Sequence, residues 1–326
     1  MLPPNGRKVV HVQSGATLLV ASAGGHLRQL VSLTATLGGL DSRAWATYDV
    51  SHARSELNGS DFVGVHHPST KNLPNALRNY RLARKVFAEH EVIRVVSTGA
   101  GVAVPFMLRA RQLGIPCHYI ESATRVQGPS LTGRILARVP GVKLYRQLGA
   151  WGGSRWRQGP CVFDGYSSGA GEARGIQRVV VSFGSHHFPF PRAVEAISRS
   201  LPQADVEVLW QLGSTPDPGT LQGRVVKQLP SEELQAEIEH ADVVIGHAGV
   251  GLSLTALAAG KVPVLLPRRR PHREHTDDHQ TQLAPELVRR GLAIGVEVEE
   301  LTGDHLADAA ARTVSYVEPP PFQLVD

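Results

Sequence analysis

Residues 243–284 constrain the fold most strongly, because two apolar runs there enclose a glycine-rich turn. The first run, residues 243–245, stops at the sequence GHAGVG, and helix-forming residues follow as far as Gly260. A second apolar and β-branched run occupies residues 262–266. Short apolar runs bounded by glycine favour buried strands, and glycine suits the end of a helix. The segment therefore predicts a strand, a turn, a helix and a second strand of an α/β layer.

The glycine turn before this helix is suited to binding an anion. The first amides of a helix have no partner within the helix, and the helix dipole adds partial positive charge there. A diphosphate can bind at such a turn without a lysine or a metal. A tight turn without a ligand has the same glycine pattern. The sequence DDHQ, which follows the second strand, favours a ligand, because ligands of such sheets bind at the carboxyl ends of the strands.

The order of strand, glycine turn and helix recurs along the chain. Apolar runs come before SAGGH, before TGAG and before Gly184 at residues 16–21, 92–97 and 178–183. Further predicted strands are 44–48, 62–65, 117–120, 206–211 and 292–296, and the later helices are 193–201, 231–241 and 304–317. This alternation predicts parallel sheets covered by helices on both faces.

We expect an α/β protein with two doubly wound, Rossmann-like domains. The predicted domains are residues 1–165 and 166–326, joined by the glycine- and serine-rich segment 163–175. A length of 326 residues fits two domains of about 150 residues each. The last predicted helix, residues 304–317, could pack back onto the first domain.

Charge and cysteine content narrow the function classes. The chain has 34 Lys and Arg against 29 Asp and Glu, a net charge of +5, which suits a nucleotide, phospholipid or nucleic-acid partner. Its cysteines, Cys117 and Cys161, are too few for a disulfide framework or a cysteine-rich zinc site. The sequence has no signal-peptide core and no apolar run of about 18 residues. We therefore expect a cytoplasmic protein that meets a membrane only at its surface.

Residues 75–90 predict an amphipathic helix with a basic outer face. Leu77 and Val86 are expected to point inward, while Arg78, Arg81 and Lys85 share the outer face. A solvated surface and contact with anionic lipid both fit this pattern. The basic and aromatic segment 128–157 likewise suits lipid headgroups, single-stranded nucleic acid or an ordinary surface.

The glycine turns and their flanking residues resemble those of GT-B glycosyltransferases. SAGGHLRQL resembles the first glycine loop of the bacterial lipid II-forming N-acetylglucosaminyltransferases, and STGAGVAVP with IPCHYIES resembles their second. GHAGVGLSLTALAAGKVPVLLPRR with HTDDHQTQLA resembles the catalytic subunit of the eukaryotic dolichol-diphosphate GlcNAc transferase and the bacterial exopolysaccharide transferases. The resemblance covers residues 16–125 and 178–300, and it implies two Rossmann-like domains that face a cleft.

The resemblance implies an inverting, metal-independent hexosyltransferase. Such an enzyme moves GlcNAc or a related hexose from a UDP-sugar, its co-substrate, to a lipid-linked or other glycosyl acceptor, and it needs no cofactor. The sugar or polyprenyl-diphosphate-linked acceptor would bind the first domain, and the UDP-sugar the second. Anionic membrane at the inner face of the plasma membrane is then the expected surface partner, and nucleic acid is not a partner.

Two departures from the family pattern bear on these expectations. The eukaryotic acceptor-side subunit is membrane-anchored, whereas this sequence shows no such segment, which makes a polyprenyl acceptor less certain. The lipid II-forming enzymes have a glutamate near the uridine ribose where this chain has Thr255, so the ribose contacts differ.

The predicted donor site belongs to the second domain. Departing diphosphate charge must be stabilised, and the turns at Gly184 and His247 can supply N–H donors. His247 is either a diphosphate contact or a hydrogen-bonded core histidine. Asp278 and its two successors are expected to bind sugar or ribose hydroxyls. The complete predicted set is Gly184, Ser185, His247, Gly249, Gly251, Thr255, Asp278, His279 and Gln280.

Other interpretations of this region concern a metal site and free arginines. Five side chains are of metal-ligating type: His272, His275, Asp277, Asp278 and His279. His275 and His279, four residues apart, would share a helix face. We prefer no metal, because helix amides already meet the diphosphate and no cysteine is near. Arg268, Arg269, Arg270 and Arg273 either attract the diphosphate or belong to a solvated loop.

His26 and Glu121 are the candidate general bases in the first domain. A neutral imidazole at the start of a helix could accept the proton of the acceptor hydroxyl, and the helix dipole helps to keep it neutral. Glu121, at the carboxyl end of a strand, is the rival base or a ligand of the acceptor hydroxyl. The predicted acceptor site also contains Gly24, Gly25, Gly99, Gly101 and Arg125.

Two other functions fit parts of this pattern. A UDP-sugar 2-epimerase on the same fold would need acid and base groups around the glycosidic carbon and C2, and no acceptor. A non-catalytic, basic subunit could bind lipid-linked sugar or nucleic acid and recruit a partner. The presence of both half-sites in one chain argues against this subunit, because the eukaryotic transferase divides them between two chains.

Overall fold

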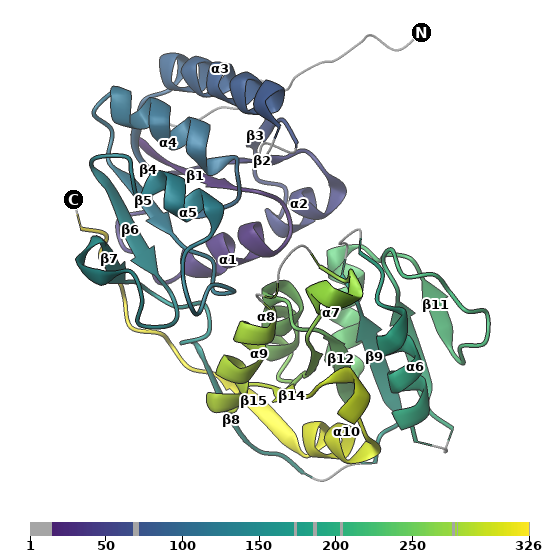
Figure 1. The fold of residues 1–326 in the computed structure, drawn as a ribbon. Coiled ribbons are helices and arrows are strands. Elements are labelled where there is room, and N and C mark those ends of the chain that lie inside the picture. The colour runs from purple at the N-terminus through teal and green to yellow at the C-terminus, as the bar shows by residue number, and fades with distance from the viewer. Residues whose placement is uncertain are drawn as a thin grey trace, which may run out of the picture.

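The computed structural model describes residues 15–67, 72–172, 175–184, 188–202, 205–275, 278 and 280–325. Figure 1 shows two bodies, each built around its own sheet, with the N-terminal half of the chain in one and most of the C-terminal half in the other. We call them the first and the second lobe. The predicted boundary between residues 165 and 166 falls between the last strand of the first sheet and the next strand in the chain.

The first lobe contains a parallel sheet in the order β3-β2-β1-β4-β5-β6-β7. Its strands are β1 Ala16–Ala21, β2 Arg43–Tyr48, β3 Phe62–Val65, β4 Val92–Gly99, β5 Cys117–Ile120, β6 Val142–Arg146 and β7 Trp156–Gln158. Strand β1 is buried along its whole length, as expected for a central strand that is covered on both faces. The predicted β-α alternation is confirmed here.

Helices cover both faces of this sheet (Figure 1). The helices are α1 Gly25–Leu33, α2 Ser51–Glu56, α3 Leu73–Glu89, α4 Ala103–Gln112 and α5 Leu131–Leu136. Alternate residues of β1 enter different cores: Leu19 packs in one core with Leu27 of α1, and Leu18 in another with Phe106 of α4. The carboxyl ends of the strands therefore feed helices on either side of the sheet.

The prediction that Leu77 of α3 points inward is wrong. Leu77 is 51% exposed, and Asn79 is buried in its place. The Asn79 amide accepts a hydrogen bond from the N–H of His66 and donates one to the carbonyl of the same residue, at 2.8 and 2.9 Å. These bonds satisfy a polar side chain inside the protein, so α3 is rotated relative to the expectation from apolar spacing alone.

The second lobe contains another parallel sheet, in the order β11-β10-β9-β12-β13-β14. Its strands are β9 Arg178–Ser182, β10 Glu207–Gln211, β11 Arg224–Val226, β12 Val243–His247, β13 Val264–Leu266 and β14 Ile294–Gly295. The helices are α6 Pro191–Ser200, α7 Ser231–His240, α8 Val250–Ala258, α9 Gln280–Arg289 and α10 Gly303–Ala310. Short 3-10 turns occur at Gly153–Arg155, Arg270–His272 and Val298–Glu300.

Two segments differ from the predictions. The predicted linker 163–175 contains strand β8, Tyr166–Ala170, which pairs in antiparallel fashion with β15, Arg312–Tyr316. The predicted helix 304–317 ends at Ala310 as α10, which contacts strands of the second sheet and does not pack on the first lobe.

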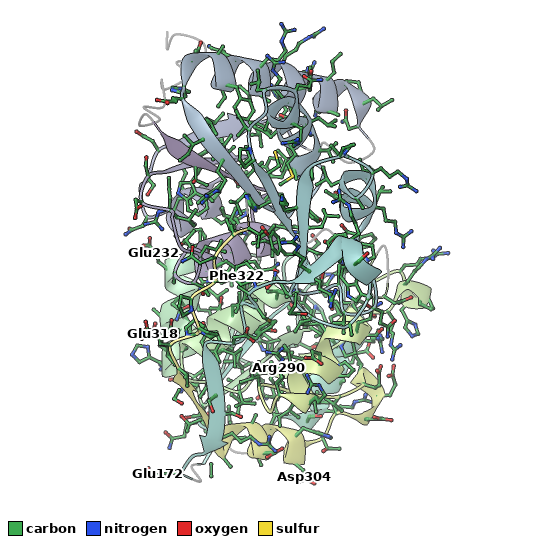
Figure 2. All side chains as sticks on the ribbon, turned by 90° about the vertical axis from the view of Figure 1, so that its left-hand side faces the viewer. Glu172, Glu232, Arg290, Asp304, Glu318 and Phe322 are labelled. Atoms are coloured by element: carbon green, nitrogen blue, oxygen red, sulfur yellow. The ribbon has the colours of Figure 1, made fainter. Side chains whose placement is uncertain are left out.

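The segment that packs back onto the first lobe is the chain after β15 and not the predicted helix. The N–H of Phe322 donates to the carbonyl of Thr36 at 2.9 Å, and its carbonyl accepts from the N–H of Gly38 at 3.0 Å. Figure 2 shows Phe322 beside the first lobe and Arg290 in the second lobe below it. Within the described residues, no helix combines the length and the apolar character that crossing a membrane requires.

Candidate functional site

Two helix N-termini from different lobes meet at the lobe boundary. Helix α1 follows β1 with Gly24 at its N-cap, and α8 follows β12 with Gly249 at its N-cap. A Cβ atom built on Gly25 would lie 4.0 Å from the nitrogen of Gly251, and one built on Gly251 would lie 3.9 Å from the Cα of Gly25. The first-turn amides of both helices therefore converge on one region, which is the geometry of an anion site.

His26 lies in the first turn of α1, and its ring is held by the end of β4. Its Nδ1 lies 2.9 Å from the carbonyl oxygen of Thr98, and the Thr98 hydroxyl donates to the carbonyl of His26 at 2.7 Å. Because a carbonyl only accepts, Nδ1 carries the proton in this hydrogen bond. In the neutral ring, Nε2 is then the basic nitrogen.

Gly99 makes room for this histidine. Its φ of +117° is a backbone conformation that other residues rarely adopt, and an added Cβ would lie 3.2 Å from Cε1 of His26. Gly101 is buried in the turn that follows, before α4. Gly99 thus lines the space around His26, and Gly101 lies in the turn that leads into α4.

Glu121 is fully buried, and its carboxylate accepts hydrogen bonds from groups inside the protein. Oε1 accepts hydrogen bonds from the Tyr119 hydroxyl and the Ser122 N–H, at 2.9 and 3.1 Å. Oε2 accepts two from Ser130, through the N–H and the hydroxyl, both at 2.9 Å. Burial raises the pKa of Glu121 above its ordinary value of 4.5, although these donors act to lower it. The carboxylate therefore fixes the loop that begins α5.

Arg125 lies half-buried in this loop, and a set of polar residues that the sequence did not reveal supports it. Gln29 of α1 accepts a hydrogen bond from the N–H of Ala123 at 2.8 Å and another from the side chain of Gln147 at 3.0 Å. The carbonyl of Arg125 accepts from the Trp151 indole at 3.1 Å. The one sequence signal that could have indicated this network is a glutamine, Gln29, in the helix that follows a glycine loop.

In the second lobe, His247 lies between two glycine turns. Gly184, which follows β9, has a φ of +68°, and a Cβ on it would lie 3.0 Å from Cε1 of His247. A Cβ on Gly249 would overlap Nε2 of the same ring. The structure thus brings together Gly184, His247 and the N-terminus of α8. Ser185, predicted in the same turn, lies outside the described residues.

Thr255 lies in α8, one turn after Gly251. Its hydroxyl donates to the carbonyl of Gly251 at 3.0 Å, a local bond to the preceding turn of the helix. The side chain is half-buried, and it shares the helix whose N-terminus faces α1.

The loop after β13 holds Asp278 and Gln280 through its backbone. Three successive amides, those of Arg268, Arg269 and Arg270, donate to the side chains of Gln280, Glu274 and Asp278, at 3.1, 2.9 and 2.8 Å. Asp278 is exposed and Gln280 is buried at the start of α9. His279, the predicted neighbour of both, lies outside the described residues.

Arg268 does not belong to a solvated loop, which corrects that prediction for this residue. Its side chain is buried, whereas Arg270 and Arg273 are exposed. Arg269 is half-buried and pairs with Glu297.

The alternative metal site rests partly on Asp277 and His279, which lie outside the described residues. Among the residues that the structure does describe, no three His, Cys, Asp or Glu side chains are grouped so that they could hold a metal ion. The ring of His275 packs against that of Phe188, with centroids 5.9 Å apart. Metal independence of the reaction stays a prediction.

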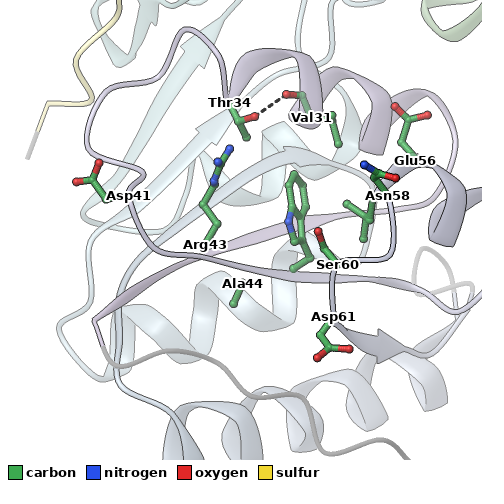
Figure 3. A pocket seen from close by; sticks show the side chains of 11 residues that line it. Val31, Thr34, Asp41, Arg43, Ala44, Glu56, Asn58, Ser60 and Asp61 are labelled. Atoms are coloured by element: carbon green, nitrogen blue, oxygen red, sulfur yellow. Dashed lines mark hydrogen bonds between the residues drawn. The ribbon is translucent and has the colours of Figure 1, made fainter.

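A cavity lies in each lobe. One of about 500 Å³ opens beyond the carboxyl ends of β10 and β11, where Gly213, Thr215 and Lys227 line it. Gly213 lies directly against the carbonyl of Gly184, so this cavity borders the donor turn. Figure 3 shows the other, of about 490 Å³, between α1, α2 and the beginning of β2. It lies at the opposite edge of the first sheet from the glycine turns.

Comparisons with known proteins agree with this arrangement. Residues 178–317 match the family described as glycosyltransferase family 28 C-terminal domain. A Synechococcus sp. (strain CC9902) protein is similar at 26% identity over 90% of both chains. Its name is UDP-N-acetylglucosamine–N-acetylmuramyl-(pentapeptide) pyrophosphoryl-undecaprenol N-acetylglucosamine transferase. A Cryptococcus neoformans var. neoformans serotype D protein, UDP-N-acetylglucosamine transferase subunit ALG13, is 30% identical over 40% of this chain and 66% of its own.

The fold also matches a solved glycosyltransferase. MurG from Acinetobacter baumannii superimposes with a TM-score of 0.56 at 19% identity, over 91% of this chain and 89% of that one. The predicted GT-B arrangement of two Rossmann-like sheets is thereby confirmed. The chain is a glycosyltransferase of the GT-B fold, and its residues 178–317 match the glycosyltransferase family 28 C-terminal domain.

Proposed function

We propose that this enzyme transfers GlcNAc or a related hexose from a UDP-sugar to a lipid-linked or other glycosyl acceptor. The observation that carries the proposal is the meeting of the α1 and α8 N-termini beside His26. The names of the Synechococcus and Cryptococcus relatives support GlcNAc as the sugar, and the former supports a diphosphate-linked polyprenol acceptor.

The donor binds the second lobe in this proposal. The first amides of α8 face the diphosphate and stabilise the charge that develops as UDP departs, with His247 and the Gly184 turn beside them. Asp278 and Gln280 use one oxygen each for the loop backbone and turn their other polar atoms to hydroxyls of the sugar or ribose. Helix dipoles take the place of a metal ion, so the reaction is metal-independent and needs no cofactor.

The acceptor binds the first lobe, with His26 as the general base. Nε2 takes the proton of the acceptor hydroxyl, and the oxygen attacks the anomeric carbon. The bond between that carbon and the diphosphate oxygen breaks, UDP leaves, and the imidazolium releases its proton to solvent. A single displacement inverts the anomeric configuration. The burial of Glu121 and its four hydrogen bonds favour a role in shaping the acceptor loop over a role as base.

Helix α3 supplies the surface for a lipid-linked acceptor. Leu73 and Leu77 are 82% and 51% exposed, and Arg78, Arg81 and Lys85 are exposed on the same helix. Apolar side chains next to cations suit the interface of an anionic membrane. We place the enzyme at the inner face of the plasma membrane as a peripheral protein.

The test of transfer is incubation of the purified protein with radiolabelled UDP-GlcNAc and a short-chain polyprenyl-diphosphate-linked sugar, with and without EDTA. We expect labelled lipid whose new linkage, determined by NMR, has the inverted anomeric configuration. The yield should be the same with and without EDTA, and the His26→Asn variant should form little labelled lipid. If the protein forms a 2-epimer of the UDP-sugar when no acceptor is present, its reaction is epimerisation and not transfer. Absence of any reaction with UDP-sugars and of UDP binding would contradict the proposal.

A sedimentation assay with phosphatidylglycerol vesicles tests the membrane surface. Serine at both Leu73 and Leu77 should lower the bound fraction, whereas Val288→Ser, at an exposed apolar residue of the second lobe, should not. Equal binding by all three proteins would exclude α3 as the contact.

A further inference from the structure

Arg268 is a buried cation just after β13, with 1% of its surface exposed. Its guanidinium donates hydrogen bonds to the carbonyls of Phe183, Phe188 and Glu274, with N···O distances of 3.0, 2.6 and 3.3 Å. Phe183 directly precedes Gly184, so one guanidinium holds both ends of the segment that starts at Phe183 and ends at Phe188. Its third partner belongs to the loop that leads to α9.

The surroundings of this guanidinium suit a residue that holds backbone in place and not one that forms an ion pair. The carboxylate of Glu274 pairs with Arg192, at 2.6 and 2.9 Å, whereas the Arg268 guanidinium donates to backbone carbonyls. The Phe190 ring packs against it, with Cζ 5.2 Å from the ring centroid. Burial lowers the pKa of Arg268 to about 10, with Glu274 acting in the opposite direction, so the group stays charged at neutral pH. A buried cation is an inefficient source of stability compared with an apolar residue.

The main chain at Arg268 begins the row of amides that binds side chains further along the same loop. The N–H of Arg268 binds Gln280, and the next two amides bind Glu274 and Asp278. The side chain of Arg268 thus binds the carbonyls on either side of the Gly184 turn, while its N–H binds Gln280. One residue therefore connects the Gly184 turn with the start of α9.

We propose that Arg268 is a positioning residue of the donor site, which holds the carbonyls on either side of the Gly184 turn in a fixed relation to Glu274 and Gln280 without contacting the donor. The proposal rests on the assignment of the second lobe as the UDP-sugar site. Lysine cannot reproduce it, because a single ammonium nitrogen cannot span carbonyls that the two terminal nitrogens of the guanidinium reach separately.

The first experiment measures donor and acceptor kinetics and UDP affinity for Arg268→Lys. We expect donor KM and UDP Kd to rise by about tenfold or more, with acceptor KM unchanged. Leu306→Ala removes a buried side chain of α10 in the same lobe and controls for lost stability. This control should lower the melting temperature and leave donor KM near the wild-type value. Unchanged donor KM and UDP Kd in Arg268→Lys would overturn the proposal.

A milder variant covers the case in which Arg268→Lys does not fold. Phe190→Leu removes the ring beside the guanidinium and leaves its carbonyl partners in place. Its donor KM should rise in the same direction by a smaller factor. A donor KM equal to that of the wild type in a folded Phe190→Leu protein, together with unfolded Arg268→Lys, would count against positioning.

Hydrogen exchange separates this proposal from the assignment of the donor. In the ligand-free protein, the amides of Gly184, Phe188, Arg269 and Arg270 should exchange faster in Arg268→Lys than in the wild type, while those of β12 should not change. This readout requires no UDP-sugar. If exchange is faster in Arg268→Lys but the wild type binds no nucleotide, Arg268 still couples the two loops, and the assignment of a UDP-sugar to this lobe is wrong. Unchanged exchange would reject the coupling itself.

Discussion

Gly25 of α1 and Gly251 of α8 approach so closely that a Cβ atom added to Gly25 would lie 4.0 Å from the amide nitrogen of Gly251. The two residues belong to different lobes and are separated by most of the chain. Neither has a positive φ, so glycine supplies space here and not an unusual backbone conformation. Amides of two helices can therefore act on one anion, provided that no side chain fills the gap.

Valine at Gly251 tests this requirement for space. Its branched side chain would occupy the gap between the helices, so UDP affinity should fall by about tenfold or more, with little change in unfolding temperature. Isothermal titration calorimetry measures the affinity. Gly169→Val places the same side chain in open space on β8 and should bind UDP normally. Normal affinity in Gly251→Val would mean that the diphosphate does not occupy the gap.

Asparagine at His26 separates the base from the structural hydrogen bond. Its side-chain N–H can still donate to the Thr98 carbonyl, but it has no basic nitrogen at the position of Nε2. We expect kcat to fall by about 10²–10⁴-fold, while UDP affinity changes by less than about twofold. Steady-state kinetics and calorimetry measure the two effects. Thr98→Val should reduce kcat less, since the ring keeps Nε2. A kcat close to wild type in His26→Asn would exclude this histidine as base.

Glutamine at Glu121 should change how stability depends on pH. Since burial raises the pKa of Glu121 above 4.5, the folded state holds the proton more tightly than the unfolded state. This group's contribution to the free energy of unfolding is then full below pH 4.5 and is lost as pH rises through the folded pKa. The wild type should lose stability relative to Glu121→Gln between pH 4.5 and neutral pH, as urea denaturation would show. A constant difference between the two proteins would contradict the raised pKa.

The strands and glycine turns could be predicted because their signals are local. Residues 16–21 and 178–182 are apolar runs followed by glycine, and both became central strands that are buried over nearly all of their length. Parallel sheets place the carboxyl ends of such strands on one edge, so Gly24, Gly184 and Gly249 could be predicted to follow strand ends, where ligands of such sheets bind.

The remaining features depend on contacts between distant residues. Strand β8 has the polar sequence YSSGA and forms because β15 pairs with it across more than a hundred residues. Leu77 is exposed because Asn79 finds backbone partners at His66, and apolar spacing carries no information about such a partner. Arg268 looks like a loop cation in the sequence, yet its carbonyl partners at Phe183 and Phe188 lie some eighty positions away.

The segment after β15 should stabilise the first lobe. Leu324 is buried in the core that contains Leu37 and Tyr145, whereas its neighbour Val325 is 42% exposed. Leu324→Ala should lower the free energy of unfolding by roughly 2–4 kcal/mol, because it leaves a cavity in that core. Val325→Ala, the matched truncation, should have an effect below about 0.5 kcal/mol. Guanidinium denaturation compares the two. Equal stabilities would show that this segment is not part of the folded core.

Calorimetric titration of UDP into the wild type and into the double variant Asp278→Ala with Gln280→Ala tests the donor site of the second lobe directly. We expect micromolar binding by the wild type, tighter than that of GDP, and affinity at least about tenfold weaker in the double variant. Asp304→Ala, an exposed carboxylate in α10, serves as control and should bind like the wild type. Absence of UDP binding by the wild type, or equal affinity in the double variant, would contradict the assignment of the donor to this loop of the second lobe.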